Sequence, residues 1–269
     1  MRNVLITTAA LVLAAGTAFA EDTPIVPQNG LGMTGEISLD FAETANDNIG
    51  GTMNLDLGID AASLATVDLD LSATDGSSVT LDNWTIGTNI NGFALAFGDD
   101  NNLMPETDAI TGTTGTLAIP TMTESLMVGT GDLSIAVGLT DWNSDISDLS
   151  NVQGAYTIGV DAAEVTVSGD YNLDSENTVL GLAANGIDLG MIEAGSALTY
   201  DMDAEVFAYE GSLGTNGLTA YLNGTDDNRL QNIGGEYTYN FAGAELTGGL
   251  NYNVDTEDMT PMASVGFAF

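Results

Sequence analysis

The sequence contains no cysteine, no histidine and no lysine, and its only basic residues are Arg2 and Arg229. Without cysteine, neither disulfides nor thiolate chemistry are available. Without histidine and lysine, the commonest general bases and amine nucleophiles are missing as well. Paired carboxylates could in principle hydrolyse glycosides, but 39 acidic residues are too many to single out a pair. We therefore expect that the protein is not an enzyme.

The scarcity of basic residues leaves a formal net charge of −37. Ion pairs cannot hold such a chain together, and nearly all carboxylates must face water or counter-ions, because burying an unpaired charge is costly. The charge excludes nucleic acid and other phosphate-rich partners. Adaptation to salty surroundings accounts for an acidic composition, but it does not explain where the acids lie in the chain.

The only long apolar run is at the N-terminus. Met1-Arg2-Asn3 is a short basic start, residues 4–16 are mostly apolar, and Ala18-Phe19-Ala20 is a small-x-small cleavage site. This pattern predicts a secretory signal peptide over residues 1–20 and a single mature domain over residues 21–269. No later stretch approaches 18 consecutive apolar residues, so we expect no transmembrane helix, although barrel strands carry a much weaker hydropathy signal.

Apolar and polar residues alternate along most of the remaining chain, as in Met53–Asp60 and Val67–Ser72. A period of two predicts β-strands. In 187–200 the apolar phase slips, so we expect one long strand with a bulge near 193–196. The pattern predicts sixteen strands, or fourteen if one short hairpin is lost. The sixteen ranges are 34–42, 52–60, 64–73, 78–88, 92–98, 122–129, 132–141, 152–160, 164–172, 177–184, 187–200, 204–213, 218–224, 231–241, 244–253 and 261–269.

The ends of these strands favour a transmembrane barrel over a soluble sheet. Tight turns alternate with longer polar loops, and the last strand, 261–269, ends on an apolar Phe269. Such an edge would invite aggregation in water but forms the seam of a closed barrel in lipid. Aromatic residues are expected in two girdles. The predicted outer girdle holds Phe41, Phe97, Trp142, Tyr171 and Tyr252, and the inner one holds Phe93, Phe241 and Phe269.

The longest connection, 98–120, follows the fifth predicted strand. A long loop in a compact domain is usually functional or disordered. If it folded inward, its acids would line a constriction of the pore; the alternative is a solvated external loop. The candidate constriction acids are Asp99, Asp100, Glu106 and Asp108. The acids of the early strands that we expect to face the lumen are Asp40, Asp56, Asp68 and Asp70.

Oxygen ligands suited to Ca²⁺ or Mg²⁺ gather at 99–102, 226–228 and 255–258. None of these segments fits an EF-hand loop or a run of calcium-binding nonapeptides. We expect no cofactor and no dedicated metal site, only weak binding of these cations.

In these features the chain resembles the general diffusion porins of Gram-negative outer membranes. The features that carry the resemblance are the signal peptide, the sixteen alternating segments, IGGEYTYNFAGAELTGGLNYN (233–253) and the terminal SVGFAF (264–269), and it covers essentially the whole mature chain. It implies an outer-membrane location, a homotrimer, lipid contact and passage of small hydrophilic solutes. It also implies that the barrel-assembly machinery reads Phe269 and that the loop after the fifth strand folds into the barrel. Pro105-Glu106 matches the Pro-Glu pair of porin constriction loops only loosely.

The chain departs from porins in one respect. Porin constrictions set loop acids against a cluster of basic residues on the opposite wall, whereas the only base of the mature chain, Arg229, falls in a predicted external loop. Carboxylates without bases predict a preference for cations. Two other interpretations of the sequence stay open. One is a secreted or surface-attached acidic β-protein that binds divalent cations, and the other is a substrate-specific channel, for which the sequence names no ligand.

Overall fold

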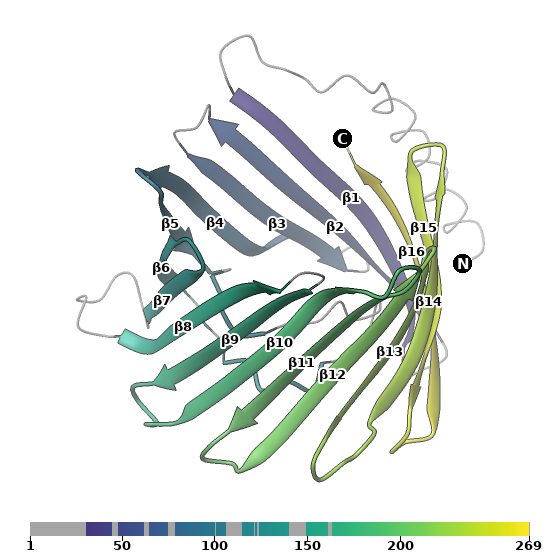
Figure 1. Ribbon diagram of the computed structural model, residues 1–269. Coiled ribbons are helices and arrows are strands. Elements are labelled where there is room, and N and C mark those ends of the chain that lie inside the picture. Colours follow the sequence, from purple (N-terminus) through teal and green to yellow (C-terminus); the bar gives the residue numbers. More distant parts are fainter. Residues whose placement is uncertain are drawn as a thin grey trace.

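A computed structural model of the protein describes residues 31–44, 48–61, 65–74, 79–99, 101–105, 115–120, 122, 124–139, 149–160 and 163–268. No helix in these ranges is long and apolar enough to cross a membrane. Sixteen strands follow one another along this part of the chain (Figure 1). They are β1 (Leu31–Thr44), β2 (Asn48–Ala61), β3 (Thr66–Thr74), β4 (Thr80–Ile90), β5 (Phe93–Gly98), β6 (Glu124–Thr130), β7 (Leu133–Leu139), β8 (Leu149–Val160), β9 (Ala163–Asn172), β10 (Thr178–Asp188), β11 (Glu193–Asp201), β12 (Val206–Thr215), β13 (Leu218–Thr225), β14 (Asn232–Phe241), β15 (Ala244–Asn253) and β16 (Asp258–Ala268).

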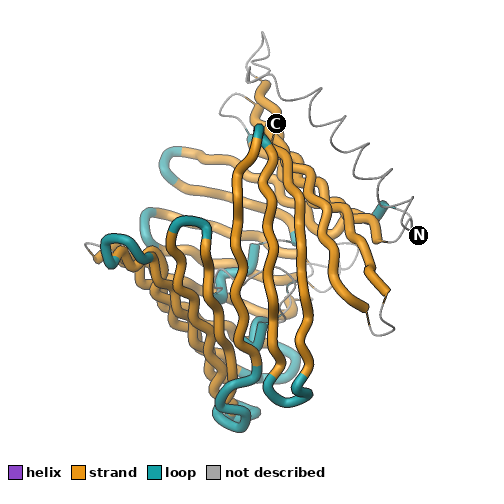
Figure 2. Tube along the Cα trace, turned by 90° about the vertical axis from the view of Figure 1, so that its right-hand side faces the viewer, coloured by secondary structure: helices purple, strands orange, loops and turns teal. Residues whose placement is uncertain are grey.

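The strands close into one antiparallel barrel. Each strand pairs with its neighbours in the sequence, and β1 pairs with β16 to complete the ring, with Glu36 opposite Ala268 and Ala42 opposite Met262. Figure 2 shows the strands running between connections at the two ends of the barrel. Closure pairs the backbone of both terminal strands and leaves no free edge. The prediction of an all-β barrel with sixteen strands is confirmed, and the alternative of fourteen is excluded.

The two ends of the barrel differ in their connections. Two-residue turns at 91–92, 131–132, 216–217 and 242–243 lie at the end where β1 begins and β16 finishes. We call it the terminal end. The opposite end, the loop end, carries the longer connections at 173–177, 202–205, 226–231 and 254–257. It also carries the longest connection, between β5 and β6. The alternation of short turns and longer loops in the sequence therefore sorts the connections onto opposite ends.

The turns at the terminal end offer a matched test of hairpin geometry. Gly217 and Gly243 both have positive φ, at 80° and 84°. A Cβ at Gly217 would lie 2.4 Å from the carbonyl oxygen of Thr238, whereas at Gly243 it would meet nothing within 4 Å. Gly243→Ala should therefore lower the free energy of unfolding only by the conformational cost of about 1–2 kcal/mol, and Gly217→Ala by more. Urea unfolding in lipid vesicles measures both, and equal losses would contradict the steric argument.

The boundary between β10 and β11 differs from the prediction. The predicted strands 177–184 and 187–200 leave a turn at Asn185-Gly186, but β10 continues to Asp188 with a register shift between Ala184 and Ile187. Gly186 has a φ of 61°, which serves a bulge as well as it serves a turn. The bulge predicted near 193–196 lies on the partner strand instead: the pairing of β10 with β11 shifts between Ala184, opposite Ser196, and Ile187, opposite Ala194, whereas β11 pairs in unbroken register with β12.

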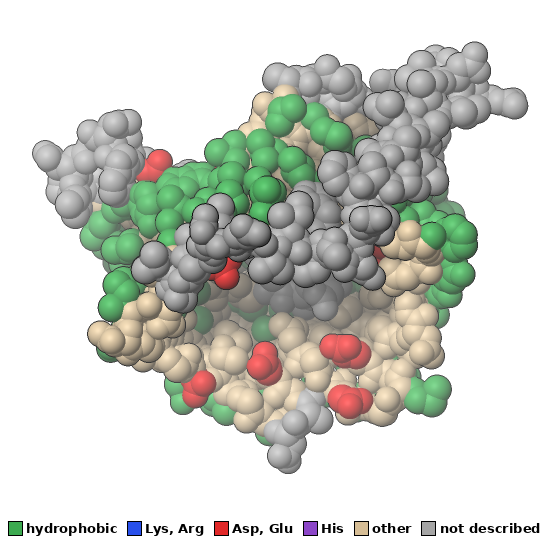
Figure 3. Space-filling model, turned by 90° about the horizontal axis from the view of Figure 1, so that it is seen from above, with side chains coloured by type: hydrophobic (Ala, Val, Ile, Leu, Met, Phe, Trp, Pro, Cys, Tyr) green, Lys and Arg blue, Asp and Glu red, His purple; other side chains and the backbone are tan. Residues whose placement is uncertain are grey.

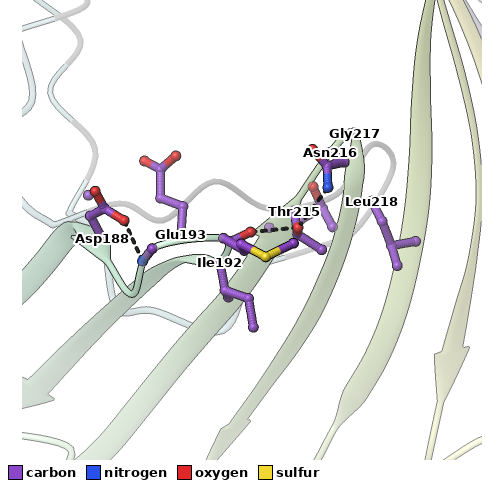
Figure 4. Close-up of a pocket in the computed structure, with 12 residues that line it drawn as sticks. Asp188, Ile192, Glu193, Thr215, Asn216, Gly217 and Leu218 are labelled. Atoms are coloured by element: carbon purple, nitrogen blue, oxygen red, sulfur yellow. Dashed lines mark hydrogen bonds between the residues drawn. The ribbon is translucent and has the colours of Figure 1, made fainter.

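The actual turn occupies 189–192. The amide of Gly190 donates to the carboxylate of Asp188 at 2.6 Å, and the hydroxyl of Thr215 donates to the carbonyl oxygen of Met191 at 2.6 Å (Figure 4). The turn is therefore held both from its own strand and from the neighbouring β12–β13 hairpin. Its Leu, Met and Ile residues give no turn signal, which explains why the sequence pattern misplaced it.

The two faces of the sheet have opposite character. In β10, Val179, Gly181 and Ala183 point inward and are buried, while Leu180 and Leu182 point outward and are 47% and 42% exposed. The same alternation runs round the ring. Large apolar side chains exposed on the outer face include Ile135, Val167, Leu213, Leu222, Ile233, Tyr237 and Leu250. This is the reverse of a soluble sandwich and suits a barrel whose outer face contacts lipid.

Aromatic residues lie on the outer face near both ends. Phe93 and Phe241 begin β5 and finish β14 at the terminal end, and both are exposed. At the loop end, Phe97 packs edge-on against Trp84 with ring centroids 5.1 Å apart. Phe41, Tyr171 and Tyr252 occupy outward positions near the same end. The predicted girdle members Trp142 and Phe269 lie outside the described residues.

Candidate functional site

The long connection between β5 and β6 begins against the barrel wall. The amide of Asp99 donates to the carbonyl oxygen of Trp84 at 3.0 Å, and the carboxylate of Asp99 accepts from the amide of Trp84. The buried side chain of Asn101 donates to the carbonyl oxygens of Gly98 and Ser125. The connection is therefore attached to β4, β5 and β6 before it leaves them.

Residues 101–105, which we call the first arm, cross the inner face of β8, β9 and β10. The amide of Leu103 donates to Gln153 Oε1 at 2.7 Å. The hydroxyl of Ser168 contacts the sulfur of Met104 at 3.8 Å. Pro105 lies against Gly181, where a Cβ would come within 2.4 Å of the proline ring. Gly181 thus provides the space in which the first arm rests.

Residues 115–120, the second arm, lie on β11, β12 and β13. The amide of Thr116 donates to Glu210 Oε1 at 2.7 Å, and the amide of Ala118 donates to Thr199 Oγ1 at 2.9 Å. The hydroxyl of Thr116 donates to the carbonyl oxygen of Tyr209 at 3.2 Å. Both arms are therefore inside the barrel, because the side chains they contact all project from its inner face. The prediction that this loop folds inward is confirmed for the described arms.

The two arms divide the inner wall into a covered and an open part. Many inward-facing side chains of β6–β13 are buried, among them Ser125, Ala136, Gln153, Ser168, Val179, Ala197, Thr199, Ala208 and Glu210. On β1–β3 and β15, inward-facing Glu36, Asp56, Asp60, Asp68 and Glu245 are exposed. On β16, Met262 is buried against Tyr221 of β13 and is an apolar exception. Figure 3 shows the hollow at one end, with carboxylates at its margin and hydrophobic side chains toward the outside. The open part, β14–β16 with β1–β4, is the candidate permeation pathway.

Acidic side chains form a row across the open wall. Glu36, Asp56 and Asp70 lie directly opposite one another in the register of β1, β2 and β3. Like charges opposite each other in a sheet destabilise it, so this arrangement costs stability and favours nearby cations. Asp40 and Asp68 face inward on the same strands, and Asp40 accepts a hydrogen bond of 2.6 Å from Asn54 Nδ2. We call the set Glu36, Asp40, Asp56, Asp68 and Asp70 the acidic wall.

The structure thus places Asp40, Asp56, Asp68 and Asp70 together on the inner face. Asp99 stands apart from them at the foot of the loop, where its carboxylate binds the backbone of β4. Asp100, Glu106, Asp108 and Phe269 lie outside the described residues. Arg229, the only base beyond residue 2, is exposed in the β13–β14 connection at the loop end, so no base projects from the inner face of the strands.

Sequence reasoning missed several inward-facing acids. Glu36, Glu236 and Glu245 follow the same alternation as the predicted lumen acids and could have been found by extending it. Asp170 and Glu210 are only 2% and 5% exposed, and Glu210 lies beneath the second arm. Asp170 accepts a hydrogen bond of 2.7 Å from Asn151 Nδ2. No pattern in the sequence distinguishes these two buried acids from the solvated ones.

The described residues contain no group of three or more acidic side chains placed to hold one metal ion together. The side chains of the acidic wall come from different strands and face the solvent of the lumen. This arrangement suits diffuse attraction of cations. The predicted oxygen-rich segments 226–228 and 255–258 lie in neighbouring connections at the loop end and are joined through Asn228 and Asp255. Weak binding of Ca²⁺ or Mg²⁺ there stays a prediction.

A closed antiparallel barrel of sixteen strands, apolar outside and polar inside, with a loop folded into its lumen, is the fold of the outer-membrane porins. Solved structures agree. A triple mutant of Rhodopseudomonas blastica porin is 13% identical, with a TM-score of 0.59 over 89% of this chain and 99% of that one. OprB of Pseudomonas putida is 10% identical, with a TM-score of 0.56 over 90% of this chain and 94% of its own.

OmpT of Vibrio cholerae, solved in a trimer form, is 9% identical, with a TM-score of 0.53 over 89% of this chain and 99% of that one. No family model matches the sequence, and no curated protein sequence matches it. The chain therefore has the porin fold with a sequence far from that of the porins it resembles.

Proposed function

We propose that the protein is a porin of a Gram-negative outer membrane, a water-filled channel through which small hydrophilic solutes and ions diffuse passively, with a preference for cations. Barrels of sixteen strands are wide enough for an aqueous channel. The apolar outer face matches lipid, and the polar inner face matches water. No step of this transport needs a catalytic group, in keeping with the lack of histidine, cysteine and lysine.

The observation that carries the cation preference is the composition of the open wall. The loop arms cover β8–β13 and leave exposed a surface bearing Glu36, Asp56 and Asp68, with no base facing them from any strand. In a water-filled cleft with low-dielectric walls, charges of one sign concentrate the counter-ion and repel the co-ion. Cations should therefore be enriched along the open wall and anions depleted.

Planar-bilayer recording in a KCl gradient tests this proposal. We expect discrete conductance steps and a reversal potential of the sign that reports faster passage of K⁺ than of Cl⁻. The preference should weaken at high salt, because the Debye length falls to about 3 Å at 1 M. A reversal potential that favours chloride would contradict the cation preference. A protein that stays monodisperse without detergent and never conducts would instead favour the acidic β-protein that folds in solution.

Further parts of the proposal concern biogenesis and assembly. Residues 1–20 would direct export, the mature domain would begin at Glu21, and the barrel-assembly machinery would read the terminal Phe269. A homotrimer is proposed because one similar structure, OmpT, was solved in a trimer form. The loop acids Asp99, Asp100, Glu106 and Asp108 remain proposed contributors to the constriction.

A further inference from the structure

The second arm of the loop rests on a carboxylate that the sequence pattern could not single out. Glu210 faces inward from β12, is 5% exposed, and accepts the amide of Thr116 at 2.7 Å. A Cβ at Gly115 would lie 2.8 Å from the same carboxylate oxygen. Gly115 therefore lets the loop backbone approach the carboxylate of Glu210 closely, because a larger residue at this position would place its Cβ against the carboxylate.

A buried carboxylate is costly unless hydrogen bonds satisfy it, and a hydrogen bond from a backbone amide to a charged acceptor is among the stronger kinds. One strand away, Thr199 accepts the amide of Ala118 at 2.9 Å. Across the barrel wall, Gln153 accepts the amide of Leu103 at 2.7 Å. All three wall side chains thus accept hydrogen bonds from amides of the loop backbone.

We propose that Glu210 is a positioning residue for the pore: its carboxylate, assisted by Thr199, holds the second arm against β11–β13 and so keeps the open wall of β14–β16 and β1–β4 clear. The side chains of the wall then set the width of the channel, because they fix the position of the loop by binding its backbone amides. The acids of the open wall set the ion selectivity. The inference rests on the proposed channel function only where ion currents are measured. The attachment of the arm to the wall can be measured whether or not the barrel conducts.

Hydrogen exchange followed by mass spectrometry measures that attachment directly. In Glu210→Ala, exchange in a peptide spanning 115–120 should accelerate roughly tenfold to a hundredfold, the range expected for losing a hydrogen bond to a charged acceptor. Glu210→Gln retains an amide oxygen for Thr116 and should restore much of the protection. The matched control is Glu164→Ala, which removes an exposed inward-facing acid of β9 near the terminal end and should leave exchange in 115–120 unchanged.

Single-channel recording supplies the second readout. Glu210→Ala should give smaller and noisier open-channel currents than the wild type, because the freed arm moves into the open part of the lumen from time to time, while Glu210→Gln should remain quiet. Unchanged exchange and unchanged current noise in a folded Glu210→Ala barrel would overturn the proposal. So would a Glu210→Gln variant as disturbed as Glu210→Ala, because the acceptor oxygen would then not be what holds the arm.

If Glu210→Ala does not fold, as judged by heat-modifiable migration on gels, Gly115→Ala tests the same contact from the exposed loop side. Its added methyl should push the arm from Glu210 and raise exchange in 115–120, and the proposal falls if exchange stays at the wild-type rate. A wild-type barrel that shows the protected arm but passes no cations would instead defeat the proposed function alone. The two failures can therefore be told apart.

Discussion

Replacing Glu36, Asp56 and Asp70 together by Gln, Asn and Asn is expected to lower the ratio of cation to anion permeability by about tenfold. These three acids lie opposite one another on β1, β2 and β3 and face the open part of the lumen. Their combined field acts where the loop arms leave the wall uncovered. Since no base opposes them from any strand, removing them takes away negative charge from the wall of the candidate pathway.

The ratio is measured as the reversal potential in a KCl gradient. The matched control removes three exposed acids from loop-end connections, Asp174, Glu176 and Asp227, and changes the net charge by the same amount. The control should keep most of the preference, because exposed charges beyond a Debye length of the pathway are screened. A control that loses selectivity while the wall variant keeps it would place the filter in the loops.

The same wall variant makes a prediction about stability. Like charges directly opposite in a sheet oppose folding, each pair by roughly 0.2–1 kcal/mol. The triple amide variant should therefore unfold at a higher urea concentration than the wild type. This outcome would show that the acidic wall is kept at a cost in stability, as expected when a surface serves permeation.

The second large effect is expected on the outer face. Val167 lies mid-strand in β9, points outward and is 51% exposed, while its neighbour Thr166 points into the lumen. Val167→Arg should lower the free energy of unfolding by about 2–4 kcal/mol, because it places a charge in the hydrocarbon region. Thr166→Arg puts the same side chain in water and should cost far less, mainly the hydrogen bond that Thr166 shares with Thr157.

Urea unfolding of the barrel refolded in lipid vesicles measures both variants, with migration on unheated gels as a check of folding. The comparison is sharp because adjacent positions receive identical side chains. If the two substitutions cost the same, the outer face of β9 does not lie in lipid, and the reading of the barrel as a membrane protein fails.

Much of the fold could be predicted from residue alternation. In a barrel, side chains alternate between an apolar outer face and a polar inner face, so the sequence pattern marks where each strand begins and ends. The predicted bounds of the strand 244–253 agree with those of β15 at both ends. Prediction failed at β10 and β11, where Asn185-Gly186 is a bulge and the turn falls on 189–192. A glycine at positive φ serves either role, and only pairing with the neighbouring strands decides which one it takes.

The candidate site divides in the same way. The alternation of apolar and polar residues predicts that Asp40, Asp56, Asp68 and Asp70 face the lumen. Each of them stands at a polar position of its strand, between apolar residues that face outward. The buried acid Glu210 could not be found, because its burial depends on a loop that lies more than ninety residues away in the chain. The attachment of Asp99 to β4 depends on the pairing of β4 with β5, which brings the amide of Trp84 to its carboxylate.

By itself, therefore, the sequence determined that the chain is an acidic, cysteine-free set of sixteen alternating segments with nothing basic to balance them. Those properties are local, because period, turn chemistry and charge can be read a few residues at a time. The tertiary structure alone decided which part of the inner wall the loop covers and which acids remain in water. That division depends on long-range contacts between loop amides and the side chains of Gln153, Thr199 and Glu210, and such contacts leave no periodic trace in the sequence.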